Sequence, residues 1–477
     1  MKVSRLSPWL ALSLTACVAA PPVPPHIEPA SPPASFDAKA ANGTSAVSLD
    51  RWWAAWGDPT LDRLVEKAIA ANPDIRTAQA HVAAARALVA VSESALYPSV
   101  SAYGAAWADL GNSKVSEPLA TNIDPYSTGN LGYARLVGLG ASWEPDIFGG
   151  RHADIAVARA IAESATHGAQ GVRLTVIADV VENYQELQGL RRRLVILDGA
   201  IATSSRLSDY VAARMQAGQA NAADVARAQN NLEALKAQRS PIVALIDARR
   251  RRLAVLAGDV PETAIALSDA NLLTVPDAPS GQLPSSVLER RPDVRARGAI
   301  IKARAARVTS LKADLKPHFG IHFLGQNGHV ELSGMPGYGG TDGLLGLTAS
   351  VPIFTGGRLR ANVAAGNAEL EAAYAAYDRS LLSALEDVES AYGFRKGLDD
   401  RLVGLTSAQR LSTRRAEQMD ALYAAGRVPL SDALQAHLEA FQDEDRTQQA
   451  LTAQGTATVQ LYRALGGGWA EPEGRSD

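Results

Sequence analysis

The chain has 477 residues and a single cysteine, Cys17. One cysteine cannot form a disulfide within the chain, and it leaves no thiols for a zinc site or for catalysis elsewhere in the sequence. Aromatic residues are also scarce, at 5% of the chain, whereas Ala and Gly are abundant. This composition suits closely spaced helices better than a bulky globular core.

The sequence also lacks the motifs that carry common chemistries. It contains no Walker-type phosphate loop, no GxSxG and no HExxH. Its net charge of -3 gives no basic excess of the kind that nucleic acid attracts. The sequence therefore predicts no enzyme, no cofactor, no metal site and no nucleic-acid partner.

The first 16 residues combine two positive charges with an apolar stretch too short to span a bilayer, which takes about 20 residues. Residues 1–16 therefore predict a signal peptide. Leu14-Thr15-Ala16-Cys17 resembles the lipobox of bacterial lipoproteins, which implies lipidation of Cys17 and, with Val18 next, retention in the outer membrane. The alternative is an ordinary secretory signal with a cysteine at a chance position. Residues 17–48 are rich in proline at their start and predict a semi-rigid tether.

Four landmarks occur twice, in the same order. They are Asn72-Pro73-Asp74 with Arg291-Pro292-Asp293, Pro98 with Pro317, Ile147-Phe148-Gly149-Gly150-Arg151 with Ile353-Phe354-Thr355-Gly356-Gly357-Arg358, and Gly218-x5-Asp224 with Gly426-x5-Asp432. The chain is therefore predicted to be a tandem duplication. Its parts are a first repeat at 49–257, a linker at 258–286, a second repeat at 287–468 and a C-terminal tail at 469–477.

Each repeat begins with a short helix, which Asn72 can cap in the first copy, and continues with two strands. In the strands, apolar side chains alternate with small or polar ones. The apolar sets are Val137, Leu139, Ala141 and Trp143, then Phe319, Ile321 and Phe323, then Leu345, Leu347, Ala349 and Val351. A period of two with one oily face is typical of outer-membrane strands.

A long helical stretch follows the strands in each repeat, at 153–216 and 359–424. About sixty residues at ~1.5 Å per residue would extend roughly 95 Å, which favours coiled-coil-like packing. After the Gly-x5-Asp turn the chain is helical again, so each repeat is expected to hold a long antiparallel hairpin. Three glycines leave open whether the first stretch is continuous: Gly168, Gly171 and Gly189.

Four strands per chain cannot close a transmembrane barrel, for which the smallest cases need about eight. An open edge in lipid would leave backbone groups unsatisfied at a cost of several kcal/mol each. Either the strands lie outside the membrane, or several chains share one barrel. Composition does not choose between two chains and three.

The chain resembles the TolC/OprM family of outer-membrane efflux proteins, and in particular its NodT-like lipoprotein branch. The motifs that carry the resemblance span nearly the whole mature chain. They are Trp52-Trp53 with Gly57-Asp58-Pro59, Asn72-Pro73-Asp74, Trp143-Glu144-Pro145-Asp146-Ile147-Phe148-Gly149, Leu288-Glu289-Arg290-Arg291-Pro292-Asp293, Pro352-Ile353-Phe354-Thr355-Gly356-Gly357-Arg358, and Ala464-Leu465-Gly466-Gly467-Gly468-Trp469.

This resemblance implies a mainly α fold with a small β part. Duplicated hairpins would form a periplasmic α-barrel, and four strands per chain would contribute to a shared 12-stranded outer-membrane β-barrel in a homotrimer. It also implies a passive conduit for small molecules, anchored in outer-membrane lipid, that works with a periplasmic adaptor and an inner-membrane pump. The exported substrate and the class of pump stay open.

In that family the tunnel ends at a periplasmic aperture where the hairpin tips converge. Matching the Gly-to-Asp turn places Asp432 at this aperture. Its expected neighbours there are Leu430, Ser431, Gln435 and Arg427, with Asp224 as its counterpart in the first repeat. Gln435 departs from the family pattern, which has a second aspartate there. Alternatively, both aspartates simply stabilise the helix N-termini in which they lie.

Three other interpretations compete with these expectations. A lipid-anchored periplasmic adaptor also contains a long hairpin, although adaptors normally carry one hairpin with strand-rich domains. A soluble helical scaffold or enzyme would leave the four alternating strands without purpose. His318 and His322 share a strand face, with His329 beyond them, and lumen-lining or loop positions suit them better than a metal site. The basic run Arg249 to Arg252 favours a solvated helix face.

Overall fold

The computed structural model describes residues 35–36, 50–108, 133–265, 275–280, 284–331 and 337–467. The described residues fall into two compact units. The strand unit gathers residues 84–162 and 299–375, and the helix unit gathers the other described residues. The predicted signal peptide, Cys17 and the tail from 469 onward lie outside the described residues.

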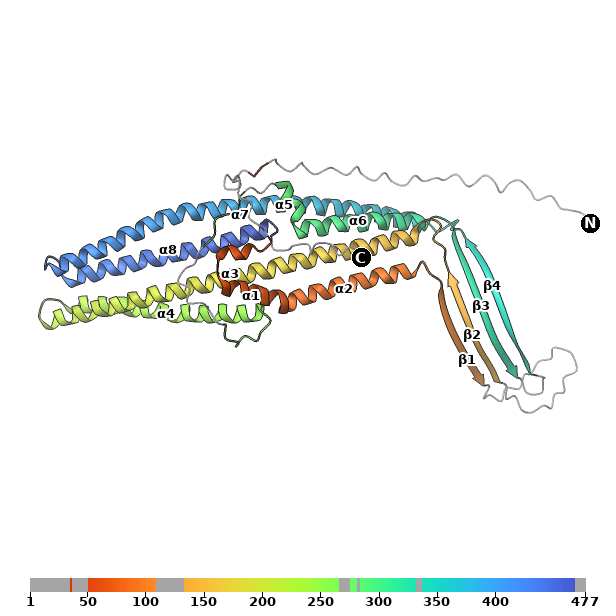
Figure 1. The fold of residues 1–477 in the computed structure, drawn as a ribbon, viewed down its shortest axis with the longest axis horizontal. Coiled ribbons are helices and arrows are strands. Elements are labelled where there is room, and N and C mark those ends of the chain that lie inside the picture. Colours follow the sequence, from red (N-terminus) through yellow and green to blue (C-terminus); the bar gives the residue numbers. More distant parts are fainter. Residues whose placement is uncertain are drawn as a thin grey trace, which may run out of the picture. The chain divides into compact units, whose positions relative to one another are not determined.

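Helices account for most of the described chain (Figure 1). They are η3 (Trp52–Trp56), α1 (Pro59–Ala71), α2 (Pro73–Ser94), α3 (Gly150–Gln216), α4 (Ala222–Leu256), α5 (Pro284–Arg290), α6 (Pro292–Ala313), α7 (Arg358–Ala424) and α8 (Leu430–Ala464). The strands are β1 (Ser99–Ala108), β2 (Tyr133–Trp143), β3 (His318–Glu331) and β4 (Tyr338–Ser350). None of the described helices has both the length and the apolar character that a membrane span requires.

The two long helices are continuous. α3 and α7 have 67 residues each, so none of the three glycines in α3 breaks the first one. One of these glycines has a packing role, because a Cβ on Gly189 would lie 2.2 Å from Oγ1 of Thr452 in α8. A glycine at this point lets the two helices approach closely. The short elements η3, α1 and α5 were not expected from the sequence.

The long helices of both repeats end in the same way. α3, α4, α7 and α8 are each followed by a glycine with positive φ: Gly218, Gly258, Gly426 and Gly466. Each glycine N–H donates to the carbonyl three residues before it, and the next N–H donates to the carbonyl five residues before itself. This is the Schellman arrangement, which satisfies the last carbonyls of a helix and favours glycine. Each hairpin therefore turns and ends by the same local geometry.

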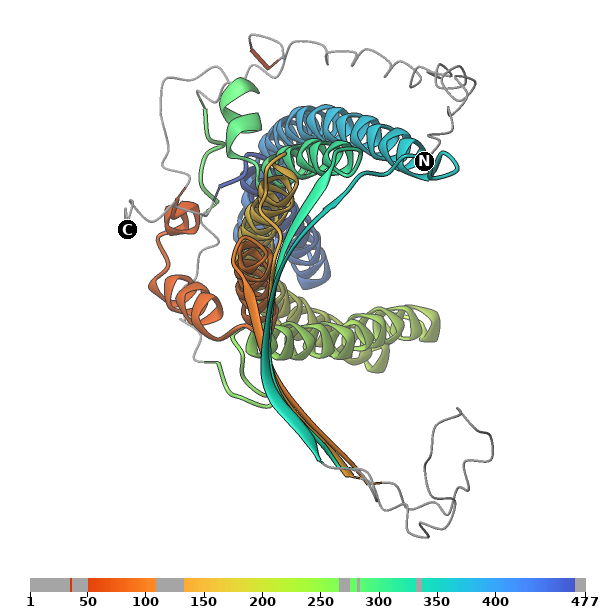
Figure 2. The same cartoon turned by 90° about the vertical axis from the view of Figure 1, so that its right-hand side faces the viewer.

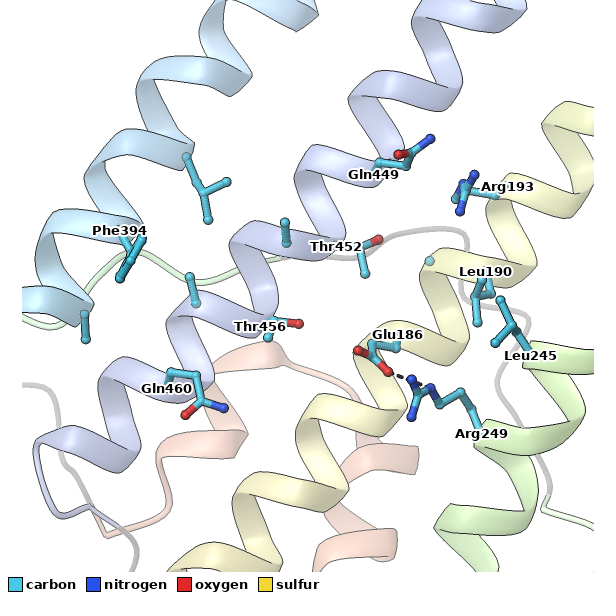
Figure 3. Close-up of a pocket in the computed structure, with 15 residues that line it drawn as sticks. Glu186, Leu190, Arg193, Leu245, Arg249, Phe394, Gln449, Thr452, Thr456 and Gln460 are labelled. Atoms are coloured by element: carbon cyan, nitrogen blue, oxygen red, sulfur yellow. Dashed lines mark ion pairs between the residues drawn. The ribbon is translucent and has the colours of Figure 1, made fainter. Parts of the chain in front are cut away.

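Within the helix unit, the four long helices lie side by side in the order α4, α3, α8, α7 (Figure 3). Ion pairs join each neighbouring pair of helices. Arg239 binds Asp198 across α4 and α3 at 2.8 Å, and Arg192 binds Glu444 across α3 and α8 at 2.7 Å. His437 binds Asp420 across α8 and α7 at 2.8 Å.

The core of the helix unit includes the aromatic residues of η3. The ring of Trp52 stacks on Tyr462 of α8, with centroids 5.0 Å apart and planes 13° apart. Both side chains are almost fully buried. Figure 2 shows η3 and α1 together on one side of the long helices. This stacking fastens η3 to α8, the last of the described helices.

The strand unit contains one antiparallel sheet in the order β1-β2-β3-β4 (Figure 2). Its registers place Ala141 opposite Phe323 and Phe323 opposite Leu345. Because side chains alternate along a strand, the expected apolar sets of β2, β3 and β4 share one face. The oily face predicted from the sequence is confirmed, and β1 and β4 are the two edges of this sheet.

Candidate functional site

The tip of the first hairpin is closed by a capping box. The side chain of Asn221 accepts a 3.0 Å hydrogen bond from the Asp224 N–H, and the Asp224 carboxylate accepts one of 3.3 Å from the Asn221 N–H. Two N–H groups at the start of α4 are thus satisfied reciprocally. Asp224 is half-buried and occupied with its own helix.

The tip of the second hairpin has a different chemistry. Pro429 occupies the N-cap position of α8 and provides no side-chain cap. Asp432 lies in the first turn of α8, is exposed, and accepts a 3.2 Å hydrogen bond from the Ser431 hydroxyl. Arg427 is exposed at the same turn, and in the described part of the chain it forms no ion pair with Asp432. The Asp432 carboxylate is therefore accessible to groups outside its own helix.

The other two predicted residues of this tip have separate surroundings. Leu430 is half-buried and packs against a small apolar cluster of Leu207, Leu434 and Leu438 that joins α3 to α8. Gln435 is exposed and lies three residues after Asp432, so both residues present to the same side of α8. Leu430 fixes the position of the tip, whereas Gln435 extends its polar surface.

Two polar side-chain contacts behind the tip, one of them an ion pair of Arg415 with Glu439, were not expected from the sequence. His437 and Arg415 contact Asp420 and Glu439 respectively, and each pair joins α7 to α8. No spacing rule marks such pairs, because their members lie on opposite arms of the hairpin. They hold the two arms together where the hairpin turns.

A groove of about 580 Å³ crosses the four long helices near their middle (Figure 3). Apolar side chains from α3, α4 and α7 meet a row of polar residues along α8: Gln449, Thr452, Thr456 and Gln460. On its α4 side, Arg249 pairs with Glu186 at 2.6 Å. Arg252 likewise pairs with Asp179 at 3.1 Å. The basic run is thus partly used to bind α4 to α3.

The strand histidines contact single polar partners. Nδ1 of His318 lies 2.9 Å from the Glu144 carboxylate, and His322 lies 3.2 Å from the Thr348 hydroxyl. The hydrogen bond with His318 is the main influence that holds the pKa of Glu144 below its usual value, while partial burial opposes it. Within the described ranges, no three His, Cys, Asp or Glu side chains group as a metal site would require.

Comparison with known proteins identifies the fold to which these features belong. Residues 64–259 and 283–467 match the family described as outer membrane efflux protein. The chain is also 30% identical over 469 residues to the pyoverdine export outer membrane protein OpmQ of Pseudomonas putida, with 96% of each chain covered. The chain belongs to the outer membrane efflux protein family. The two matched segments overlap most of the residues predicted as the two repeats, 49–257 and 287–468.

Solved structures support the same assignment for this efflux protein. The outer-membrane channel OprN is 28% identical, with a TM-score of 0.78 over 93% of this chain and 99% of that one. The MtrE channel of Neisseria gonorrhoeae has a TM-score of 0.77 over 94% and 98%, and at 23% identity it bears on the fold alone.

The function expected from the sequence is confirmed by this membership. The protein is the outer-membrane channel of an efflux system and is not an enzyme. It works as a trimer, with a helical periplasmic tunnel and a shared β-barrel, together with an adaptor and an inner-membrane pump. The alternative of a periplasmic adaptor is wrong, because the matches to channels extend along both repeats.

Proposed function

We propose that the α7–α8 tips of three chains form the charged ring of the periplasmic aperture, with Asp432 as its ionised group. The observation that carries this proposal is the difference between the two tips. Asp224 is engaged in a capping box, whereas Asp432 is exposed and bonded only to the neighbouring hydroxyl of Ser431 among the described residues. Asp432 can therefore contact ions or another chain without breaking a cap.

Three such carboxylates around a narrow pore concentrate negative potential, which favours cations and repels anions. The N-terminus of α8 stabilises each negative charge by an additional few tenths to about 1 kcal/mol. Gln435 follows on the same side of the helix and is neutral, so the ring has one layer of charge. Arg427 is the proposed partner that holds Asp432 of an adjacent chain in the closed state.

We also propose that the conduit is unselective towards its cargo and that the pump chooses the substrate. The names of relatives refer to pyoverdine, antibiotics and toluene, which share little chemistry.

The aperture proposal is tested by single-channel recording in planar bilayers. Asp432→Ala is expected to raise the conductance and to weaken the preference for cations. Asp432→Asn removes the charge with little change in side-chain volume, so it should also weaken the preference for cations. Asp224→Ala is the matched control, because it removes an acid at the equivalent turn of the other hairpin. Conductance and cation preference unchanged in Asp432→Ala would remove this residue from the aperture.

The lipid anchor remains a separate proposal, based on the lipobox-like sequence before Cys17. Two or three acyl chains, at about 0.8 kcal/mol per buried CH₂, would hold the N-terminus stably in the membrane. Cys17→Ser should abolish acylation. Mass spectrometry of the mature N-terminus gives the answer, and an acyl-free cysteine in the parent protein would contradict the proposal.

A further inference from the structure

The groove of Figure 3 opens on one face of the layer that the four long helices form. Trp52 of η3 stacks on Tyr462 of α8, and the Tyr184 hydroxyl of α3 donates to the N-cap residue of α1. Gln460 and Glu186 line the groove, and each lies two residues from one of these tyrosines. Two residues turn an α-helix by about 200°, so the groove lies on the face opposite η3 and α1.

The same division applies to α7. The Tyr392 hydroxyl donates a 2.7 Å hydrogen bond to the Pro279 carbonyl in the linker between the repeats. Phe394 lies two residues further along α7, lines the groove and is 72% exposed. Cargo passes along the inner face of a tunnel wall, so that face has to stay free of additional elements. η3, α1 and the linker therefore belong to the outer face, and the groove opens into the tunnel.

The groove has the size and lining of a small-molecule site. Its volume of about 580 Å³ lies within the roughly 300–1,000 Å³ that is usual for such sites. Small residues leave space in it, and larger apolar side chains provide contact area. The small residues are Gly189, Ala391, Ala453 and Ala457, and the apolar ones are Leu190, Leu245, Phe394 and Leu398. A flat apolar group can therefore lie in the groove.

Along α8 the groove presents mainly hydrogen-bond acceptors. The amide nitrogen of Gln449 donates to Asp445 at 2.6 Å, and that of Gln460 donates to Glu182 at 3.1 Å. The Thr452 hydroxyl donates to a backbone carbonyl of its own helix at 2.9 Å. These side chains keep their oxygen lone pairs for other donors. The row therefore favours a ligand that carries O–H or N–H groups.

The charged side chains of the groove neutralise one another. Arg249 pairs with Glu186 at 2.6 Å, and Arg193 pairs with Asp445 at 2.7 Å. A charged ligand would have to separate one of these pairs or enter without a counter-charge, and an unpaired charge in a partly buried site is costly. An uncharged ligand meets no such penalty.

We propose that this groove is a transit site for uncharged amphiphilic molecules, those with a flat apolar ring and at least one O–H or N–H donor. The ring lies against Phe394 and Leu245, and the donor bonds to the acceptors along α8. The trimer places three such sites around its tunnel. A conduit has to release what it binds, so each contact is weak. Weak binding of a broad chemical class leaves the choice of cargo with the pump.

The site is tested with a thiol placed inside the groove of the full-length trimer. Ala453 is exposed and lines the groove, so the thiol of Ala453→Cys should react readily with N-ethylmaleimide. The probe is 2-naphthol, which is uncharged at neutral pH and joins a flat apolar ring to one O–H donor. At saturation it should slow this alkylation by roughly fivefold or more, because a pocket of this kind encloses most of a bound ligand. Mass spectrometry of the peptide that contains position 453 gives the rate.

Gln442→Cys is the matched control for position. Gln442 is exposed and lies on the same side of α8, but it does not line the groove. It precedes Ala453 by about three turns, or roughly 16 Å. Equal slowing at both positions, or no slowing in Ala453→Cys, would overturn the site. A thiol in Ala453→Cys that fails to react without the probe would show that a neighbouring copy covers the groove, which would also overturn it.

Two related probes test the ligand class. 2-Methoxynaphthalene keeps the ring but lacks the donor, so the same protection should need a roughly fivefold higher concentration, as expected for one lost hydrogen bond. Naphthalene-2-sulfonate carries a negative charge and should give no protection, because both arginines of the groove are already paired. Equal protection by all three compounds would overturn the assigned chemistry.

The ring contact is tested at Phe394. Because this side chain is largely exposed, Phe394→Ala should leave the fold intact. Combined with Ala453→Cys, it should weaken protection by 2-naphthol roughly fivefold, as expected for the loss of an aromatic contact. Undiminished protection in the double variant would remove Phe394 from the site. None of these measurements involves Asp432, so they are independent of the proposed aperture.

Discussion

The buried side-chain amide of Asn72 donates a hydrogen bond of 2.9 Å to the carbonyl oxygen of Leu256, the last residue of α4. Its side-chain oxygen accepts the N–H groups of Asp74 and Ile75, so the same residue caps α2. In the second repeat the equivalent position is Arg291, which reaches the carbonyl of Ala464, the last residue of α8, at 3.3 Å. Each repeat thus ties the start of its short helix to the end of its hairpin.

Replacing Asn72 by Ala should destabilise the helix unit. Loss of an N-cap costs about 1 kcal/mol, and an unsatisfied buried carbonyl costs about 1–3 kcal/mol. Asn72→Ser keeps a capping acceptor without adding charge and loses the amide donor to Leu256, so it separates the two contributions. Thermal unfolding of the solubilised trimer, followed by tryptophan fluorescence, should show both variants below the parent. An unchanged melting temperature in Asn72→Ala would contradict the role of this contact.

The glycines that follow the helices should differ in their tolerance of alanine. A Cβ on Gly258 would lie 2.6 Å from the Ala71 carbonyl oxygen, in addition to its positive φ, whereas a Cβ on Gly218 meets nothing within 4 Å. Gly218→Ala should therefore lower the free energy of unfolding only by the conformational strain, about 1–2 kcal/mol. Gly258→Ala should lower it distinctly more, because the added methyl group also meets the Ala71 carbonyl. The two melting temperatures measured side by side give the comparison. Equal losses would show that the Ala71 contact relaxes without cost.

Two glycines inside α3 should give effects of opposite sign. Gly189→Ala places a methyl group against Thr452, whose Oγ1 and Cγ2 would lie 2.2 and 3.0 Å away, and should cost about 1–3 kcal/mol by overpacking. Gly168 is exposed, with nothing within 4 Å of a Cβ, so Gly168→Ala should stabilise the helix by about 0.5–1 kcal/mol. Thermal unfolding measures both. A stabilised Gly189→Ala variant would contradict the close approach of α3 and α8.

The duplicated hairpins were predictable because their signals are local. Within each Gly-x5-Asp turn, and within the Asn-Pro-Asp start, the residues lie only a few positions apart, and capping rules translate each motif directly into geometry. The role of Gly189 was not predictable. Its conformation is ordinary for a helix, and only contact with Thr452, far along the chain, gives it a purpose.

The aspartates at the two hairpin tips, Asp224 and Asp432, differ in a local signal that the sequence already contains. Asn221 three residues before Asp224 is a capping-box spacing, whereas Pro429 three residues before Asp432 cannot provide a side-chain cap. The sequence alone therefore distinguishes Asp224, which can join a capping box, from Asp432, which cannot.

Acidification should weaken the contact that closes the second repeat. Arg291 pairs with Asp293 at 2.7 Å and with Asp387 at 2.9 Å. Burial alone would raise the pKa of Asp293, but the hydrogen bond and charge of Arg291 outweigh it and hold this pKa below its usual value. A depressed pKa in the folded state means that the pair stabilises the protein above about pH 4 and that the contribution is lost as pH falls further.

The melting temperatures of the parent protein and of Asp293→Asn should therefore differ most near neutral pH, and the difference should shrink progressively as the pH falls below about 4. Asp74→Asn is the matched control, since Asp74 occupies the equivalent first-turn position beside Asn72 instead of an arginine. Both substitutions remove an acid from a helix N-terminus, so the helix-dipole contribution cancels between them. A difference between parent and Asp293→Asn that persists undiminished at pH 3 would show that the Arg291 pair is not what stabilises this junction.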